Sequence, residues 1–317
     1  MEKNRKIVLS ILLLIVLSSI LAIIDIGMNM EQGKESSFQI SVPQIGVGVG
    51  IVRINGPIRF INNGGKIIGI TSGAEAIINR LNDLGNDRRI KAIIVRINSP
   101  GGTVAATQEI FQKLIKLKKE NKILIASMGD IAASGGYYIA SACNHIMANY
   151  GTITGSIGVI AVSPNLKELF KKIGIKMNVI KSGKYKDLMS SYRDISDKER
   201  ELLQMLIDSS YMQFLKDVSL GRNVPISDIK PYADGRIVDG RTAMKYKLID
   251  SIGVFEDAIN KAREMANLSD DSPVYDDIIN PLERFIMSME TIFKSQTGIE
   301  ERLLNKNNFL IEYRFEP

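Results

Sequence analysis

The stretch Ile90–Glu120, "IKAIIVRINSPGGTVAATQEIFQKLIKLKKE", decides the fold class because it holds a strand, a turn and a helix in immediate succession. Its first eight residues are a nearly continuous apolar run, which predicts a strand buried on both faces. Pro100, Gly101 and Gly102 then form a turn signal, and the helical pattern after them ends in lysines, as helix C-termini prefer. A strand that leads through a short turn into a helix is typical of a parallel α/β architecture.

The same alternation continues on both sides of this stretch. Upstream, residues 49–54 predict a strand, and the apolar residues of 74–84 recur at the spacing of one helical face. Downstream, strand signals fall at 122–128, 145–149, 157–162 and 176–180, and helix signals at 129–142, 165–174, 197–220 and 254–266. We therefore expect a sheet of mostly parallel strands with helices packed on it.

Composition excludes several classes of function. The chain has 317 residues and a formal net charge of +6, but its basic residues are scattered and lack interleaved aromatic residues, so we expect no nucleic-acid partner. The single cysteine, Cys143, excludes an internal disulfide framework and a zinc cluster built from cysteines. The single histidine, His145, excludes any mechanism that needs two imidazoles. We expect neither a metal nor a cofactor.

The N-terminus predicts a membrane anchor. Residues 7–24 contain no charged side chain, and as a helix they would extend about 27 Å, close to the hydrocarbon thickness of a bilayer. Basic residues precede this run and acidic residues follow it, which places residues 1–6 in the cytoplasm and the rest of the chain outside. A cleaved signal peptide is the alternative, but the run is long for one and Ile20-Leu21-Ala22 is a poor cleavage site.

Beyond the anchor, composition divides the chain into three parts. Residues 25–46 are polar and predict a linker, and residues 47–266 hold the strand and helix alternation of one domain. The tail, residues 267–317, has apolar residues at helical spacing between Leu282 and Phe293, which predicts an amphipathic helix. Such a helix packs on the body, on a neighbouring subunit or on a membrane surface.

Two predicted junctions between a strand and a helix hold candidates for chemistry, because parallel sheets place reactive groups at the carboxyl ends of strands. At the first, the backbone N–H groups of Gly101 and Gly102 lie at the start of a helix, where an oxyanion can be held. At the second, Ser134 lies among small residues in "GDIAASGGYYIASA" (129–142). Alone, a Gly-Gly turn is more often only a turn, and such a serine is more often a cap or a packing residue.

A nucleophilic serine needs a general base. His145 follows Ser134 by 11 residues, and a mostly helical segment would place it about 15 Å away, so we expect a structural role for it. Lysine is the other recognised partner. At its ordinary pKa of about 10.4 a lysine is neutral in about one molecule in 2,500 at pH 7, so the base must be desolvated or lie beside another cation.

One predicted loop contains lysines that are candidates for the general base. Lys181, Lys184 and Lys186 follow the strand predicted over 176–180, and Arg193 is near them in the sequence. Neighbouring cations would help to lower the pKa of one of these lysines. On spacing alone, a solvated basic loop is the simpler interpretation.

Five motifs, in this order, resemble peptidase family S49, the membrane-bound serine proteases known as signal peptide peptidases. They are "INSPGG" (97–102), "DIAASGGYYIASA" (130–142), "TGSIGVI" (154–160), "SGKYKD" (182–187) and "ADGRIVDGRTA" (233–243). The resemblance implies an α/β fold of the Clp protease and crotonase type, a superhelix of repeated ββα units, preceded by one transmembrane helix.

The resemblance also implies roles for particular residues. Ser134 would be the nucleophile and Lys186 the general base of a Ser-Lys dyad. The backbone N–H groups of Gly102 and Gly135 would form the oxyanion hole, and Ser156 would line the substrate site. Lys181 and Lys184 fall outside the catalytic position of the motif.

One serine motif and one lysine motif are typical of the short members of the family, in which adjacent subunits of a ring share each site. The resemblance thus implies a homo-oligomeric endopeptidase at the outer face of the cytoplasmic membrane, acting on cleaved signal peptides and other hydrophobic peptides. "MSSYR" (189–193) and "CNHIMAN" (143–149) depart from the usual family residues. A stomatin-cleaving membrane protease, an inactive scaffold ring and crotonase-type acyl-CoA chemistry remain alternatives.

Overall fold

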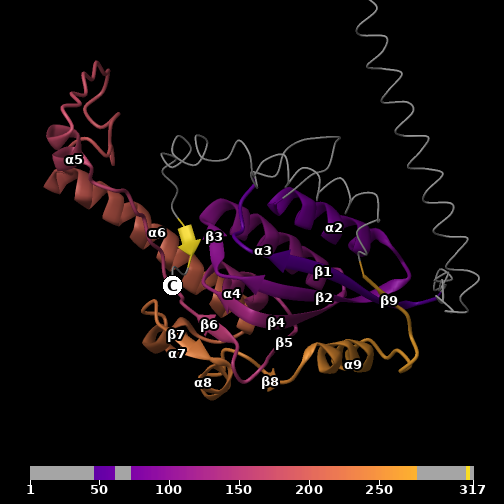
Figure 1. Ribbon diagram of the computed structural model, residues 1–317. Helices are drawn as coiled ribbons and strands as arrows, with labels where there is room; N and C mark the ends of the chain where they lie inside the picture. Colours follow the sequence, from indigo (N-terminus) through magenta and orange to yellow (C-terminus); the bar gives the residue numbers. More distant parts are fainter. Residues whose placement is uncertain (1–45, 61–72, 277–311, 315–317) are drawn as a thin grey trace, which may run out of the picture. The chain divides into compact units, whose positions relative to one another are not determined.

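The computed structural model describes residues 46–60, 73–276 and 312–314 (Figure 1). Its helices are α2 (Ala74–Asn86), α3 (Val104–Lys119), α4 (Gly135–Ser141), α5 (Lys167–Lys172), α6 (Asp197–Arg222), α7 (Ile226–Ile229), the short 3-10 helix η1 (Lys230–Tyr232), α8 (Gly240–Lys245) and α9 (Phe255–Met265). Its strands are β1 (Gly48–Asn55), β2 (Ile90–Ser99), β3 (Gly101–Thr103), β4 (Ile123–Ala133), β5 (His145–Ala148), β6 (Ile153–Gly155), β7 (Ile237–Asp239), β8 (Ser251–Ile252), β9 (Val274–Tyr275) and β10 (Glu312–Arg314).

The main sheet of the described residues has eight strands. Its central order is β7-β6-β4-β2-β1-β9, with β5 beside β4 and β8 beside β5. All neighbours in it are parallel except β6 and β7, which are antiparallel. The parallel α/β class predicted from the alternation of strands and helices is therefore confirmed.

Strand β2 lies at the centre of the sheet and is buried on both faces. Ile93, Val95 and Ile97 pack into the core beneath α2, α3 and α4. Ala92 and Ile94 point to the other face, into a smaller core formed with α9. Figure 1 shows α2 and α3 on one side of the strands and α9 on the other. This alternation explains why the strand is apolar at nearly every position.

Three predicted elements differ in the structure. The helix expected over 129–142 is shorter, because β4 continues to Ala133 by pairing with β6 and only Gly135–Ser141 is helical. The strands expected over 157–162 and 176–180 are irregular, apart from one isolated bridge at Ile160. β-propensity forms a strand only where a neighbour supplies backbone partners, and residues 176–180 are exposed throughout.

Two short strands beyond residue 266 join the body. β9 pairs with β1, and β10, the short yellow arrow in Figure 1, pairs with β3. The predicted anchor at 7–24, the linker and the predicted tail helix at 282–293 lie outside the described residues. Among the described helices, none combines the length and the apolar character that a membrane crossing requires.

Candidate active site

The turn between β2 and β3 is held in a conformation that only glycine allows. Ser99 Oγ donates a hydrogen bond to Gly56 O at 2.6 Å and accepts one from Gly101 N at 3.1 Å. Gly101 has a φ of 105°, a backbone region that favours glycine. A Cβ on Gly102 would lie 1.9 Å from Ile58 O, so a side chain there would displace the strand. The Gly-Gly turn is thus required by the close approach of two backbones.

This packing directs the amide of Gly102 away from Ile58. Ile58 N donates to Gly101 O and Thr103 N donates to Ile58 O, each at 2.9 Å. Neighbouring residues in a strand direct their backbone polar groups to opposite edges. The N–H and C=O of Gly102 therefore face the other edge of β3, where β10 lies.

Ser134 joins β4 to α4 in a strained backbone conformation. Its φ is 53° and its ψ −113°, a combination that costs a residue with a side chain roughly 1–3 kcal/mol. Backbone hydrogen bonds of 2.8 Å hold it there, from Ser134 N to Gly155 O and from Tyr138 N to Ser134 O. The side chain does not cap α4, so the capping alternative is excluded. Strain of this kind is concentrated at functional sites.

The two junctions meet beside Ser134. A Cβ built on Gly135 would lie 3.1 Å from Gly102 N, so the backbones of the two glycines lie side by side. Ser156 lies at the end of β6 with only 8% of its surface exposed. A cavity of about 360 Å³ opens at Ser134 and Ser156, and Ile157, Val159, Ile207 and Tyr211 are among the residues that line it. The structure therefore brings together Ser134, Gly102, Gly135 and Ser156.

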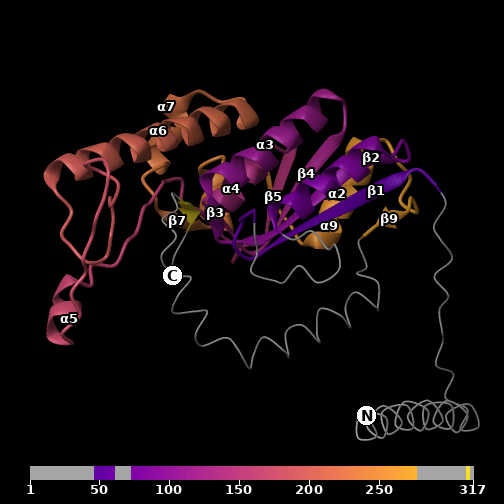
Figure 2. The ribbon, with the colours of Figure 1, turned by 90° about the horizontal axis from the view of Figure 1, so that it is seen from above.

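Lys186 does not lie at this cavity in the same chain. It belongs to the loop between α5 and α6, its side chain is exposed, and it makes no hydrogen bond to Ser134. The loop is attached to Glu199 near the start of α6, whereas α6 reaches the cavity at Ile207. Eight helical residues separate these two points by about 12 Å along the axis. Figure 2 shows α6 leading from the side of α4 toward the segment that holds α5.

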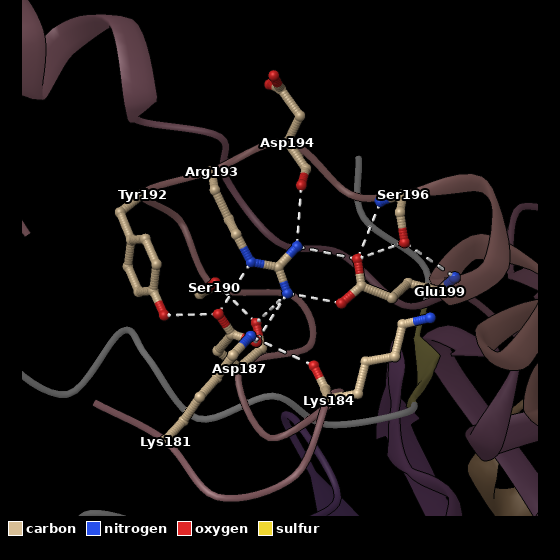
Figure 3. Close-up of polar contacts among 9 residues, drawn as sticks. All are labelled: Lys181, Lys184, Asp187, Ser190, Tyr192, Arg193, Asp194, Ser196 and Glu199. Atoms are coloured by element: carbon tan, nitrogen blue, oxygen red, sulfur yellow. Dashed lines mark hydrogen bonds and ion pairs between the residues drawn. The ribbon is translucent and has the colours of Figure 1, made fainter. Parts of the chain in front are cut away.

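Arg193 anchors the loop that carries Lys186 (Figure 3). Its guanidinium contacts Asp187 at 2.9 Å and Glu199 at 2.6 Å, and Lys181 also pairs with Asp187. Hydrogen bonds from Arg193 and Lys181 hold the pKa of Asp187 well below its usual range, and Arg193 lowers the pKa of Glu199 to about 2. Lys181 and Arg193 are thus both paired with carboxylates, which offsets the lowering of a lysine pKa that neighbouring cations would cause.

We expect replacement of Arg193 by methionine to loosen this loop. Loss of the paired contacts should lower amide hydrogen-exchange protection of residues 181–196 by roughly three- to tenfold at pH 7. Arg200→Met, an exposed arginine near the start of α6 that has no ion pair among the described residues, is the matched control. Unchanged protection in Arg193→Met would contradict the anchoring role.

The same network predicts a pH dependence. A carboxylate whose pKa is lowered by folding stabilises the folded state above its unfolded pKa, and this contribution is lost as the pH falls through the folded pKa. For Glu199 the window runs from an ordinary value of 4.5 down to about 2. The protection of the loop, corrected for intrinsic exchange, should therefore persist from pH 7 to about pH 5 and decline below about pH 4.

The environments of His145 and Cys143 indicate structural roles for both residues. His145 pairs with Ile125 near the start of β4, whereas Ser134 follows the last residue of this strand, so the two residues lie toward opposite ends of β4. His145 Nε2 instead lies 2.7 Å from Ser251 Oγ. Burial raises the pKa of the Cys143 thiol to about 12, which keeps it protonated and unreactive.

The strand β10 lies in an extended conformation beside the Gly-Gly turn. β10 pairs antiparallel with β3, with Glu312 opposite Thr103 and Tyr313 opposite Gly102. On the other edge of β10, Glu312 exchanges two backbone hydrogen bonds of 3.1 Å with Ile160. Sequence reasoning did not predict that β10 pairs with β3 and Ile160, since three residues after a long tail carry no signal of where they pair.

Comparisons with known proteins agree with this geometry. Residues 116–269 match the family model of Peptidase family S49, and residues 62–150 match that of Clp protease. A Synechocystis protein named as a protease, slr0021, is 46% identical over 212 residues, which is 67% of this chain and 76% of that protein. The chloroplastic serine protease SPPA of Arabidopsis thaliana is 37% identical over 71% of this chain, although the match spans only 32% of the plant protein. An Enterococcus faecium protein named as a signal peptide peptidase is 36% identical over 61% of this chain and 56% of its own length.

The fold and the site together define a serine peptidase with a Clp protease-like α/β fold. The chain belongs to peptidase family S49. The resemblance seen in the five sequence motifs is thereby confirmed at the level of the family.

Proposed function

We propose that the chain is a membrane-anchored serine endopeptidase that degrades cleaved signal peptides and other hydrophobic peptides at the outer face of the cytoplasmic membrane. The observation that carries the proposal is the strand β10, which lies in main-chain pairing beside Gly102 at the edge of β3. A site that holds an extended segment by its backbone suits peptide substrates, because main-chain pairing is independent of side-chain identity.

In the proposed mechanism, Ser134 is the nucleophile and Lys186 the general base. Neutral Lys186 Nζ takes the proton of Ser134 Oγ, and Oγ bonds to the peptide carbonyl carbon. The oxyanion accepts hydrogen bonds from the N–H groups of Gly102 and Gly135. The C–N bond then breaks as Lys186 returns the proton to the leaving amine. Lys186 next deprotonates a water molecule that attacks the acyl carbon, and the C–Oγ bond breaks as the proton passes from Lys186 to Ser134 Oγ.

The lysine is proposed to come from an adjacent subunit of a ring. Within one chain, Lys186 is exposed and separated from the cavity at Ser134 along α6. The segment that carries it also exposes large apolar side chains: Val162, Leu169, Ile173, Ile175, Met177, Val179 and Ile180. So much apolar surface on one segment is typical of a protein contact. A second copy of the chain is the partner that would cover it and receive Lys186.

We expect Ile180→Asp to weaken this assembly. Ile180 is fully exposed in the single chain, so the change should leave the subunit fold intact while placing a charge in the contact. Sedimentation should show smaller species, and hydrolysis should fall with the loss of the shared site. Leu220→Asp, 62% exposed at the other end of the α6 region, is the control and should leave both unchanged. A fully assembled Ile180→Asp protein would contradict the proposed contact.

The substrate class is tested by hydrolysis in detergent micelles. The cavity beside Ser134 offers apolar side chains such as Ile157, Val159 and Ile207, so apolar peptides of signal-peptide length should be cleaved at least about tenfold faster than charged peptides of equal length. A fluorophosphonate should label Ser134. Cleavage of a single defined membrane protein, with no hydrolysis of loose peptides, would favour the stomatin-cleaving alternative, and absence of labelling would favour an inactive scaffold.

A further inference from the structure

β10 lies between β3 and Ile160, and the guanidinium of Arg59 contacts it there. Arg59 Nη2 lies 2.7 Å from Glu312 Oε1, and the side chain of Glu312 is only 9% exposed. A carboxylate buried to this degree is stable only with a partner of opposite charge. Arg59 therefore supplies the recognition of this side chain, beyond the main-chain pairing of β10.

The backbone of Arg59 is held by residues of the main domain and not by β10. The preceding residue, Ile58, is bonded to both Gly101 and Thr103, and Arg59 O accepts a hydrogen bond of 2.8 Å from Ala74 N at the start of α2. The backbone from which the guanidinium extends is thus held beside β3, the strand that contains Gly102. Arg59 Nε is buried and has no hydrogen-bond partner among the described residues, so the guanidinium retains a further donor.

The register between β10 and β3 places the pair of Arg59 and Glu312 next to the position where the reaction would occur. The backbone groups of Glu312 bond to Ile160, so those of the next residue, Tyr313, face the opposite edge of β10 and the amide of Gly102. In the proposed mechanism, the carbonyl that faces Gly102 is the one that is attacked. Glu312 therefore occupies the position immediately before the residue whose carbonyl would be attacked.

We propose that Arg59 forms a subsite selective for acidic side chains, at the residue immediately before the one whose carbonyl faces Gly102. The inference rests on the proposed peptidase function and narrows it: among extended apolar peptides, those with glutamate at this position bind and react best. Glu312 of the chain's own tail fills the subsite in the structure. Peptide substrates and the tail would then compete for one guanidinium.

The test uses the full-length chain and one apolar peptide made in three forms, with Glu, Gln or Lys at this position. The wild-type chain should show a kcat/KM about tenfold higher for Glu than for Gln, as one charge-assisted hydrogen bond in a partly buried site allows. Arg59→Gln should abolish the preference, and Arg59→Glu should reverse it toward the Lys peptide. Arg53→Gln is the matched control, because Arg53 lies on β1 and pairs with Asp276.

A second variant separates substrate recognition from tail anchoring. Glu312→Gln should weaken the binding of β10 and raise hydrolysis of all three peptides, with the Glu preference retained. If Arg59 only anchors the tail, Arg59→Gln will raise hydrolysis equally and the wild-type chain will not distinguish Glu from Gln, which overturns the proposal.

Binding of the same three peptides, each labelled with a fluorophore, to Ser134→Ala keeps this test independent of catalysis. A Glu preference in binding without hydrolysis by the unmodified chain would leave the subsite standing and refute the proposed peptidase mechanism. Equal binding of the Glu and Gln peptides refutes the subsite.

Discussion

Replacement of Ser134 by alanine, or of Lys186 by methionine, should each reduce peptide hydrolysis by at least about 10³-fold. Ser134 Oγ is the only atom proposed to form the acyl bond, and no other residue replaces it at the junction of β4 and α4. Methionine preserves the length of the Lys186 side chain and removes only its ability to accept a proton. The two losses should be similar, because nucleophile and base act as a unit.

Matched controls separate chemistry from folding. Lys184→Met changes a lysine two residues away in the same loop, outside the catalytic position of the motif, and should retain most of the activity. Thermal unfolding should be nearly unchanged in Lys186→Met, because Lys186 is exposed. Ser134→Ala should be as stable as the parent chain to within the small change expected from the strained backbone. Activity within tenfold of the parent in either variant would contradict the Ser-Lys assignment.

Replacement of Gly102 by alanine should lower kcat/KM by about 10²–10³-fold, with a smaller loss of stability. The new methyl group would lie 1.9 Å from Ile58 O, so β3 must move and carry the amide of Gly102 away from its position beside Gly135. An oxyanion donor displaced in this way no longer meets the charge that develops on the attacked carbonyl. Labelling of Ser134 by a fluorophosphonate should slow as well, since this reaction uses the same donors.

Gly151→Ala is the matched control for this change. A Cβ on Gly151 meets no atom within 4 Å, and its φ is not positive, so the substitution should alter neither activity nor stability beyond small effects. If Gly102→Ala retained full kcat/KM, the amide of Gly102 would not be part of the oxyanion hole.

The sheet and its helices follow from local signals, whereas the site depends on long-range contacts. The apolar run Ile90–Ile97 predicts a buried central strand, because its alternate side chains pack into one core on each face of the sheet. Asp197 to Leu220 likewise predicts a helix, and α6 begins at Asp197 with a capping box formed by Ser196 and Glu199. By contrast, "KMNVI" (176–180) has the composition of a strand, but none of the strands that the structure describes pairs with it.

The geometry of the candidate site likewise depends on contacts that no local sequence pattern predicts. Small residues around Ser134 predict a close approach but not the φ of 53°, which arises because β6 and α4 fix both sides of the residue. Arg193 lies six residues after Asp187 and six before Glu199, a spacing compatible with an exposed basic loop, and only the fold turns the three into a network. Arg59 and Glu312 are 253 residues apart, and no local pattern relates them.

The most direct test of the shared active site is to mix the two inactive variants. Ser134→Ala and Lys186→Met, co-expressed with different tags and purified as mixed assemblies, should recover hydrolysis. In a ring formed at random from equal amounts, about a quarter of the sites would combine an intact serine with an intact neighbouring lysine. We therefore predict recovery to about a quarter of the parent activity. Mixed assemblies that form normally and remain as inactive as either variant alone would contradict a dyad shared between subunits.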